Sequence, residues 1–148
     1  MVSQIAKKVL VHTGCPLCDQ KKAKEQRKSG KYSKSKGNRY EQKIAKELRE
    51  LGFSGVVTSR SESKKIDNLK VDLIDTNQQL PFYAQLKCTS NTPSFFKIKS
   101  QCSLNDKPFV LFWNSQKVSD GQVNMHSEGE VVFVPKEFFY KLIKNYIK

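Results

Sequence analysis

Two extended segments joined by a polar turn bring together the residues of this sequence that are best suited to chemistry. Residues 70–75 and 81–88 each contain alternating apolar positions and flank a polar turn, a pattern that predicts a β-hairpin. If the turn is centred at residues 78–79, Asp72 lies directly opposite Gln85, and directly opposed residues have Cβ atoms roughly 5 Å apart.

The alternation of side chains along a strand predicts which residues share a face of this hairpin. Lys87 lies two residues after Gln85 and therefore points to the same side of the sheet, as does Asp72 across the hairpin. The opposite, buried side is expected to consist of Val71, Leu73 and Leu86. A carboxylate, an amide and an ammonium group are thus expected to meet on one face.

These three groups suit the hydrolysis of a phosphodiester. The carboxylate of Asp72 and the side-chain carbonyl of Gln85 are oxygen ligands for a hard cation such as Mg²⁺ or Mn²⁺, which keeps several waters and needs few protein ligands. The ammonium of Lys87 can orient or deprotonate the attacking water and neutralise charge developing on the phosphate. Asp67 and Asp75 rank below Asp72, because one lies in the preceding loop and the other at the turn.

A helix is expected before the hairpin. Asn38 stands in an N-cap position with Glu41 three residues later, as in a capping box, and apolar residues follow at helical spacing until Gly52. This pattern predicts a helix over residues 39–51.

The remaining elements are predicted from the periodicity of apolar residues and from residues, such as Pro135, that interrupt or begin an element. Strands are predicted at 56–59, 70–75, 81–88, 109–114 and 131–134, polar loops at 61–69 and 121–129, and a final helix with an apolar stripe after Pro135. Residues 89–106 fit either strand or helix. The order predicts one α/β domain with a mixed β-sheet flanked by helices.

Positive charge is concentrated near the N-terminus. The sequence has 27 Lys and Arg against 14 Asp and Glu, a formal net charge of +13. Because 11 of these basic residues lie in residues 1–40 with only two acids, we expect a flexible basic arm over residues 1–35 that binds nucleic-acid phosphates. A solvated tail and an anchor to an acidic membrane are the alternatives. The expected phosphate contacts here are Lys31, Lys34, Lys36 and Arg39.

A pair of cysteines in this arm has the spacing of a zinc half-site. Cys15 and Cys18 form a CxxC motif, and His12 lies three residues before it. Three interpretations remain: a structural zinc (Zn²⁺) knuckle completed by Cys102, His126 or a second subunit; a redox pair; or two small turn residues without a role.

The hydropathy pattern of the sequence indicates where in or outside a cell the protein is expected. No apolar run approaches the roughly 18–20 residues that span a bilayer, and Lys7 and Lys8 interrupt the only apolar stretch near the start. We therefore expect a protein inside a cell, whether in cytoplasm, nucleoid or a virus-infected host, with no membrane partner.

The motif residues resemble a known family. Glu41, Val71-Asp72-Leu73-Ile74 and Gln85-Leu86-Lys87 resemble the PD-(D/E)xK nuclease superfamily, particularly its Holliday junction resolvase-like members and the group I intron homing endonucleases, some of which carry a QxK version. The resemblance covers residues 36–148 and implies a restriction-endonuclease-like fold.

The resemblance also implies roles for individual residues. Glu41, Asp72 and Gln85 would bind the metal, and Lys87 would assist the nucleophile. Further phosphate contacts are implied at Ser59, Arg60 and Ser61, and suggested at Thr89, with a plain polar loop and a strand end as the alternatives. The usual carboxylate is replaced by Gln85, which removes one negative charge and lowers the expected affinity for the cation.

The function implied is that of a Mg²⁺-dependent endonuclease acting on duplex or branched DNA, structure-selective as resolvases are. We expect a homodimer, because two strands must be cut by subunits with one site each. The alternatives are a site-specific homing or restriction-type endonuclease, a catalytically inactive nucleic-acid-binding protein, which Gln85 favours, and a zinc-stabilised RNA-binding protein built on the arm.

Overall fold

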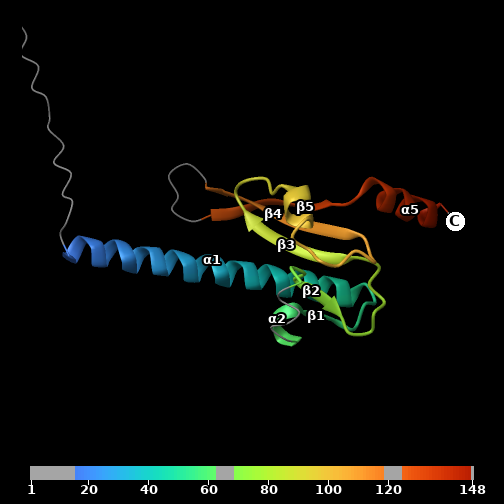
Figure 1. Cartoon of the computed structure of the whole chain (residues 1–148), viewed down its shortest axis with the longest axis horizontal. Coiled ribbons are helices and arrows are strands. Elements are labelled where there is room, and N and C mark those ends of the chain that lie inside the picture. Colours follow the sequence, from blue (N-terminus) through green and yellow to red (C-terminus); the bar gives the residue numbers. More distant parts are fainter. Residues whose placement is uncertain (1–15, 63–68, 119–124, 148) are drawn as a thin grey trace, which may run out of the picture. The chain divides into compact units, whose positions relative to one another are not determined.

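The computed structural model describes residues 16–62, 69–118 and 125–147, and the chain divides after Lys34 into two units, residues 1–34 and 35–148. The described elements, in order, are α1 (Pro16–Glu50), β1 (Val56–Thr58), α2 (Ser59–Glu62), β2 (Leu73–Asp75), β3 (Tyr83–Thr89), α4 (Phe95–Lys99), β4 (Phe109–Val118), β5 (Met125–Phe133) and α5 (Lys136–Tyr146) (Figure 1). The chain is therefore of the α/β class, as predicted.

The strands form one five-stranded mixed sheet in the order β1-β2-β3-β4-β5. β1 with β2, β2 with β3, and β4 with β5 are antiparallel pairs, whereas β3 and β4 are parallel. Parallel neighbours need a crossover connection, and here the connection contains α4. Residues 89–106, which fitted strand or helix equally in sequence, thus hold a short helix.

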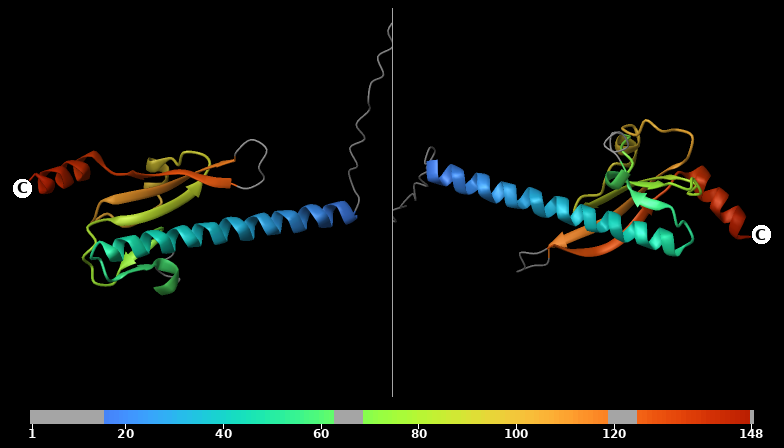
Figure 2. Two further views of the ribbon diagram at one scale, coloured as in Figure 1. Left: turned by 180° about the vertical axis from the view of Figure 1, so that it is seen from behind. Right: turned by 90° about the horizontal axis from the view of Figure 1, so that it is seen from below.

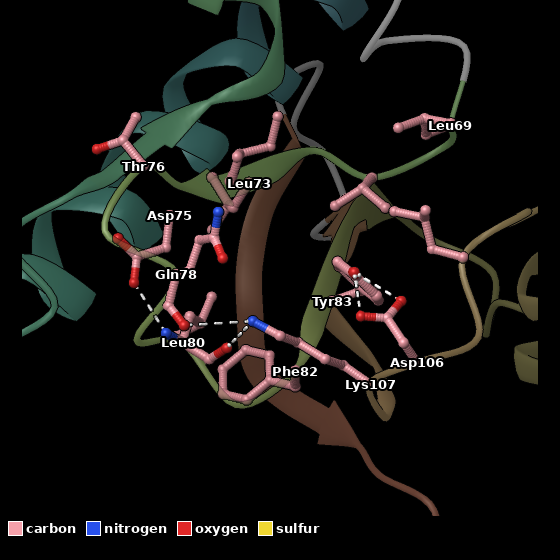
Figure 3. Close-up of a pocket in the computed structure, with 13 residues that line it drawn as sticks. Leu69, Leu73, Asp75, Thr76, Gln78, Leu80, Phe82, Tyr83, Asp106 and Lys107 are labelled. Atoms are coloured by element: carbon pink, nitrogen blue, oxygen red, sulfur yellow. Dashed lines mark hydrogen bonds between the residues drawn. The ribbon is translucent and has the colours of Figure 1, made fainter.

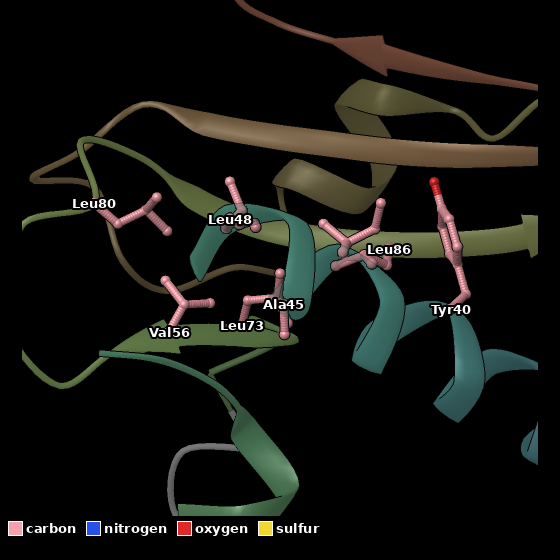
Figure 4. Packing of buried hydrophobic residues seen from close by; sticks show 9 residues of the cluster. Tyr40, Ala45, Leu48, Val56, Leu73, Leu80 and Leu86 are labelled. Carbon is pink, nitrogen blue, oxygen red and sulfur yellow. The ribbon is translucent and has the colours of Figure 1, made fainter. Parts of the chain in front are cut away.

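Two hydrophobic clusters cover opposite faces of the sheet, because successive side chains of β3 alternate between them. The first cluster unites α1 with β1, β2 and β3 (Figure 4), and its buried members are Tyr40, Ile44, Ala45, Leu48, Val56, Leu73, Leu80, Ala84 and Leu86. The second holds Val71, Cys102, Phe109 and Leu111, with Phe95 and Ile98 of α4 packed against it. The sheet is thus covered by α1 on one face and by the α4 segment on the other.

The start of α1 corrects two expectations. The predicted flexible arm is helical from Pro16 onward, and Asn38 lies inside the helix, so the capping box with Glu41 does not form. Lys, Ala, Gln, Glu and Arg dominate this stretch and favour helix, which outweighs a cost of about 1 kcal/mol each for Gly30 and Gly37. Residues 1–15 of the arm lie outside the described residues.

The entry to the hairpin also differs from the sequence prediction. The predicted loop at 61–69 begins with the end of α2, while β2 starts at Leu73 rather than at residue 70. Lys70 has a φ of 58°, a left-handed conformation that no regular strand contains. The chain turns there, and Val71 therefore joins the second cluster instead of lying beside Leu73 in the first.

The β4–β5 hairpin is longer than predicted (Figure 2). β4 continues to Val118, and β5 begins at Met125 within the predicted loop 121–129. This outer part pairs polar residues, such as Lys117 with His126, after an irregularity between Ser115 and Gln116. Because this outer part of the hairpin buries almost no apolar side chain, its sequence lacks the alternation of apolar and polar residues that predicts a strand.

The final helix begins after Pro135, as predicted. Of its apolar stripe only Phe138 is buried, and the exposed members are Phe139, Leu142, Ile143, Tyr146 and Ile147. None of the helices in the three described ranges combines the length and apolar composition of a bilayer-spanning segment.

Candidate active site

The register of the β2–β3 hairpin is the one that the sequence predicts. Leu73 pairs with Ala84, and the backbone N–H of Asp72 donates to the carbonyl of Ala84 over 2.9 Å. The same register sets Asp72 opposite Gln85. The hairpin therefore brings the predicted acid and amide side by side.

The carboxylate of Asp72 reaches across to β3. Its Oδ2 accepts the backbone N–H of Leu86 over 2.7 Å, and Leu86 is the residue between Gln85 and Lys87. This contact holds the carboxylate at the middle of the Gln85-Leu86-Lys87 triplet. Leu86 itself points into the first cluster, as expected from strand alternation.

The other two side chains of the triplet contact each other. When the Gln85 carboxamide is oriented to satisfy both of its ends, its oxygen accepts from Lys87 Nζ and its nitrogen donates to the carbonyl of Lys70, each over 3.3 Å. Gln85 is buried and Lys87 is half-buried. The carboxylate, the amide and the ammonium are thus gathered along a short stretch of β3.

Glu41 approaches from α1 and is held by an arginine. Its side chain is 8% exposed, and Oε1 lies 3.2 Å from Arg60 Nη2. Arg60 also donates to the side-chain oxygen of Asn38, so the guanidinium bridges two residues of one helix. The adjacent Ser59 donates its backbone N–H to the carbonyl of Asp72 over 2.9 Å. Arg60 is therefore the next residue in the chain after Ser59, which is hydrogen-bonded to Asp72.

The sequence did not predict this use of Arg60. Glu41 and Arg60 lie on different elements, and no short-range spacing rule pairs them. Because Asn38 was interpreted as a helix cap, its contact with Arg60 was not expected. Only the packing of α1 against the end of β1 reveals the contact.

The remaining predicted phosphate contacts differ in exposure. Lys31, Lys34 and Arg39 are exposed, and Lys36 is half-buried, with its Nζ 3.7 Å from Met125 Sδ. The Ser59 side chain is only 1% exposed, which conflicts with a direct phosphate contact in this conformation. The hydroxyl groups of Ser61 and Thr89 donate to the carbonyls of Thr58 and Asn91, over 2.6 Å and 2.9 Å.

Asp72 and Gln85 are of the residue types that bind a hard cation with few protein ligands. Asp72 and Gln85 offer a carboxylate and an amide oxygen, which Mg²⁺ accepts together with waters. Within the described residues there is no group of three or more His, Cys, Asp or Glu side chains that could hold a metal. Of the two proposed ligands, only Asp72 has a negative charge.

The zinc hypothesis concerns a different part of the chain. His12 and Cys15 lie outside the described residues, and Cys18 belongs to α1 but its side chain is not described. Cys88 and Cys102 are thiols rather than disulfides, and burial raises the pKa of Cys88. The zinc knuckle stays a prediction.

A polar cluster that the sequence did not reveal lies between α1 and the β4–β5 hairpin, with an exposed ion pair beside the buried Tyr40 and Asn114. Glu130 Oε1 accepts from Lys43 Nζ over 2.6 Å and from Asn114 Nδ2 over 2.9 Å. Tyr40 is nearby, and burial, followed by the charge of Glu130, raises the pKa of its phenol. Its hydroxyl finds no hydrogen-bond partner in the described part of the chain. The contact between Lys43 and Glu130 joins α1 to β5.

An open pocket of about 560 Å³ lies at the turn end of the hairpin (Figure 3). Lys107 donates to the carbonyl of Leu80 over 2.8 Å, and Tyr83 donates to Asp106. None of Glu41, Asp72, Gln85 or Lys87 lines it. The pocket therefore does not contain the four candidate residues, although Val71 and Leu73, which flank Asp72, line it.

Comparison with protein-family models, with curated proteins and with solved structures gives no significant match.

Proposed function

We propose that this protein is a metal-dependent DNA endonuclease of the PD-(D/E)xK kind, with its site at Asp72, Gln85 and Lys87. The observation that carries the proposal is the convergence of these residues: the Asp72 carboxylate bonds to the N–H between Gln85 and Lys87, and the last two contact each other.

Each residue has a distinct task in the proposed reaction. Asp72 and Gln85 would hold a Mg²⁺ or Mn²⁺ ion, which when bound supplies positive charge to the scissile phosphate. Lys87 orients the attacking water and offsets the negative charge that grows on the phosphate oxygens. The N–H of Leu86 keeps the Asp72 carboxylate aimed at the site.

The proposed substrate class rests on the exposed positive charge and on the single site that we propose for each chain. The exposed Lys31, Lys34 and Arg39 favour contacts with a phosphate backbone, which position a nucleic acid without reading its sequence. We therefore favour branched or duplex DNA recognised by shape, cut by a homodimer. Sedimentation of the full chain, alone and with a four-way junction, tests the dimer.

The cleavage test compares a four-way junction with a linear duplex of the same sequence in Mg²⁺ or Mn²⁺. Asp72→Asn and Lys87→Ala should each reduce the rate by at least about a hundredfold, as expected for groups acting on the reacting phosphate. Lys97→Ala is the matched control, since Lys97 is an exposed lysine of α4. Cutting that survives in both site variants would refute the proposal.

A second candidate is a nucleic-acid-binding protein that has the site but does not cut. It is favoured by Gln85 and by the lack of a three-acid cluster in the described residues. Gln85→Glu separates the two, because it supplies the missing carboxylate. If the wild-type chain binds DNA without cutting it, and Gln85→Glu cuts, the second candidate function is correct.

A further inference from the structure

The inference concerns Glu41 and Arg60 and rests on the proposed function. Glu41 is the acid that the family resemblance would make a metal ligand, yet its carboxylate is paired with the Arg60 guanidinium at 3.2 Å. A carboxylate that is 8% exposed needs such a partner, because a buried unpaired charge is costly.

The formal charges of the five candidate side chains balance. Glu41 and Asp72 are negative, Arg60 and Lys87 are positive, and Gln85 is neutral. A site with three acids and one lysine would have a net charge of −2 and could attract two divalent cations. A balanced site offers much less attraction to a second cation, since affinity depends on the charge count of the ligands.

Arg60 is placed to serve the phosphate as well as the acid. Its side chain is 42% exposed, and a guanidinium has five N–H donors. Contacts to Asn38 and Glu41 are therefore compatible with a further contact to a phosphate oxygen, for which the planar guanidinium is well suited. Because Ser59 is bonded to Asp72, that phosphate would lie beside the proposed cation.

We propose that Arg60 takes the place of a second metal ion: it neutralises Glu41, which is then not a metal ligand, and it binds the DNA phosphate beside a single cation held by Asp72 and Gln85. Arg60 is thus a phosphate-binding residue, and Glu41 is a positioning residue that holds it.

The decisive variant is the doubly neutral Glu41→Gln/Arg60→Gln. It removes both charges of the pair together, so it leaves the charge balance unchanged and leaves no unpaired buried ion. Binding of Mn²⁺ to the full chain without DNA is measured by electron paramagnetic resonance of the free ion. Asp72→Asn serves as the reference for a lost ligand, and thermal unfolding checks that each variant is folded.

The inference predicts how the Mn²⁺ affinity of each variant should differ from that of wild type. The double variant should bind within about twofold of wild type, and Arg60→Gln alone should bind about tenfold more tightly, because the Glu41 charge is no longer balanced. Asp72→Asn should lose at least about tenfold. A double variant as weak as Asp72→Asn would show that Glu41 is a ligand and would overturn the inference, while leaving the nuclease proposal intact.

DNA binding provides the second readout. Without divalent metal, Arg60→Gln and the double variant should each lower the slope of log affinity against log salt by about one, the effect of one lost phosphate contact. An unchanged slope in both would overturn the phosphate contact. If wild type and Asp72→Asn bound Mn²⁺ equally, the metal site itself would be refuted, and both proposals with it.

Discussion

Replacing Asp75 should cost stability and spare the chemistry, the reverse of what we expect for Asp72. The Asp75 carboxylate is 9% exposed and accepts three backbone N–H groups of its own turn. Oδ1 accepts from Asn77 over 3.0 Å, and Oδ2 accepts from Gln79 and Leu80 over 2.8 Å each. The turn that fixes the hairpin register is thus organised around this one carboxylate.

The magnitude follows from these bonds. A hydrogen bond to a charged group contributes about 1.5–3 kcal/mol, and a buried N–H left without a partner costs about 1–3 kcal/mol. Asn77 and Gln79 are exposed, so water replaces two of the bonds, whereas Leu80 is buried. We expect Asp75→Ala to lower the free energy of unfolding by about 3–4 kcal/mol. Asp75→Asn should cost about 2 kcal/mol, because its amide keeps one acceptor oxygen.

Urea denaturation followed by circular dichroism measures the effect, with Asp72→Asn as the matched comparison. An asparagine at position 72 can still accept the N–H of Leu86, so its free energy of unfolding should change by less than about 1 kcal/mol. Below the unfolding transition, Asp75→Asn should cleave DNA at the wild-type rate per folded molecule. Wild-type stability in Asp75→Ala would refute the account of the turn.

Three further outcomes are expected. Gly55→Ala should lower the free energy of unfolding by at least about 2 kcal/mol in the same urea assay, because a Cβ there would meet the Asp75 carboxylate and lie 2.8 Å from the backbone nitrogen of Asn77; a loss below 0.5 kcal/mol, roughly the range of ordinary surface changes, would contradict this. Tyr40→Phe should raise the free energy of unfolding by up to about 1 kcal/mol, because it removes a buried hydroxyl that has no partner in the described residues; a marked loss would mean that the hydroxyl is bonded after all. Replacing Lys31 and Lys34 together by Ala should reduce the salt slope of DNA binding by about two, measured by fluorescence anisotropy, without changing stability; an unchanged slope would remove these lysines from the interface.

The hairpin was predictable because its determinants are local. The alternation of side chains and the length of the turn fix the pairing of Asp72 with Gln85, since a shift by one residue would turn the apolar face outward. Pro135 likewise marks the start of α5 by a local rule. Sequence reasoning therefore located the register of this hairpin and the start of α5, although β2 begins at Leu73 rather than at residue 70.

The errors lie where local signals compete or where only tertiary contacts decide. Asn38 and Glu41 have the spacing of a capping box, yet the helix propensity of the preceding lysines and alanines extends α1 through them. The left-handed Lys70 moved Val71 to the other core cluster, and no pattern in the sequence marks that turn. The pairing of Glu41 with Arg60 joins separate elements and could not be found by spacing.

The packing around Gln85 suits an amide better than a carboxylate. Its amide nitrogen donates to the carbonyl of Lys70, and its oxygen accepts from Lys87. A glutamate there would set a carboxylate oxygen against the Lys70 carbonyl, a buried repulsion that a bound cation or protonation of the carboxyl group would relieve. A neutral amide avoids this repulsion, and in the proposed site it would do so at the expense of affinity for the cation. In the proposed site, Arg60 would supply positive charge near the phosphate from the chain itself, while it stays paired with Glu41.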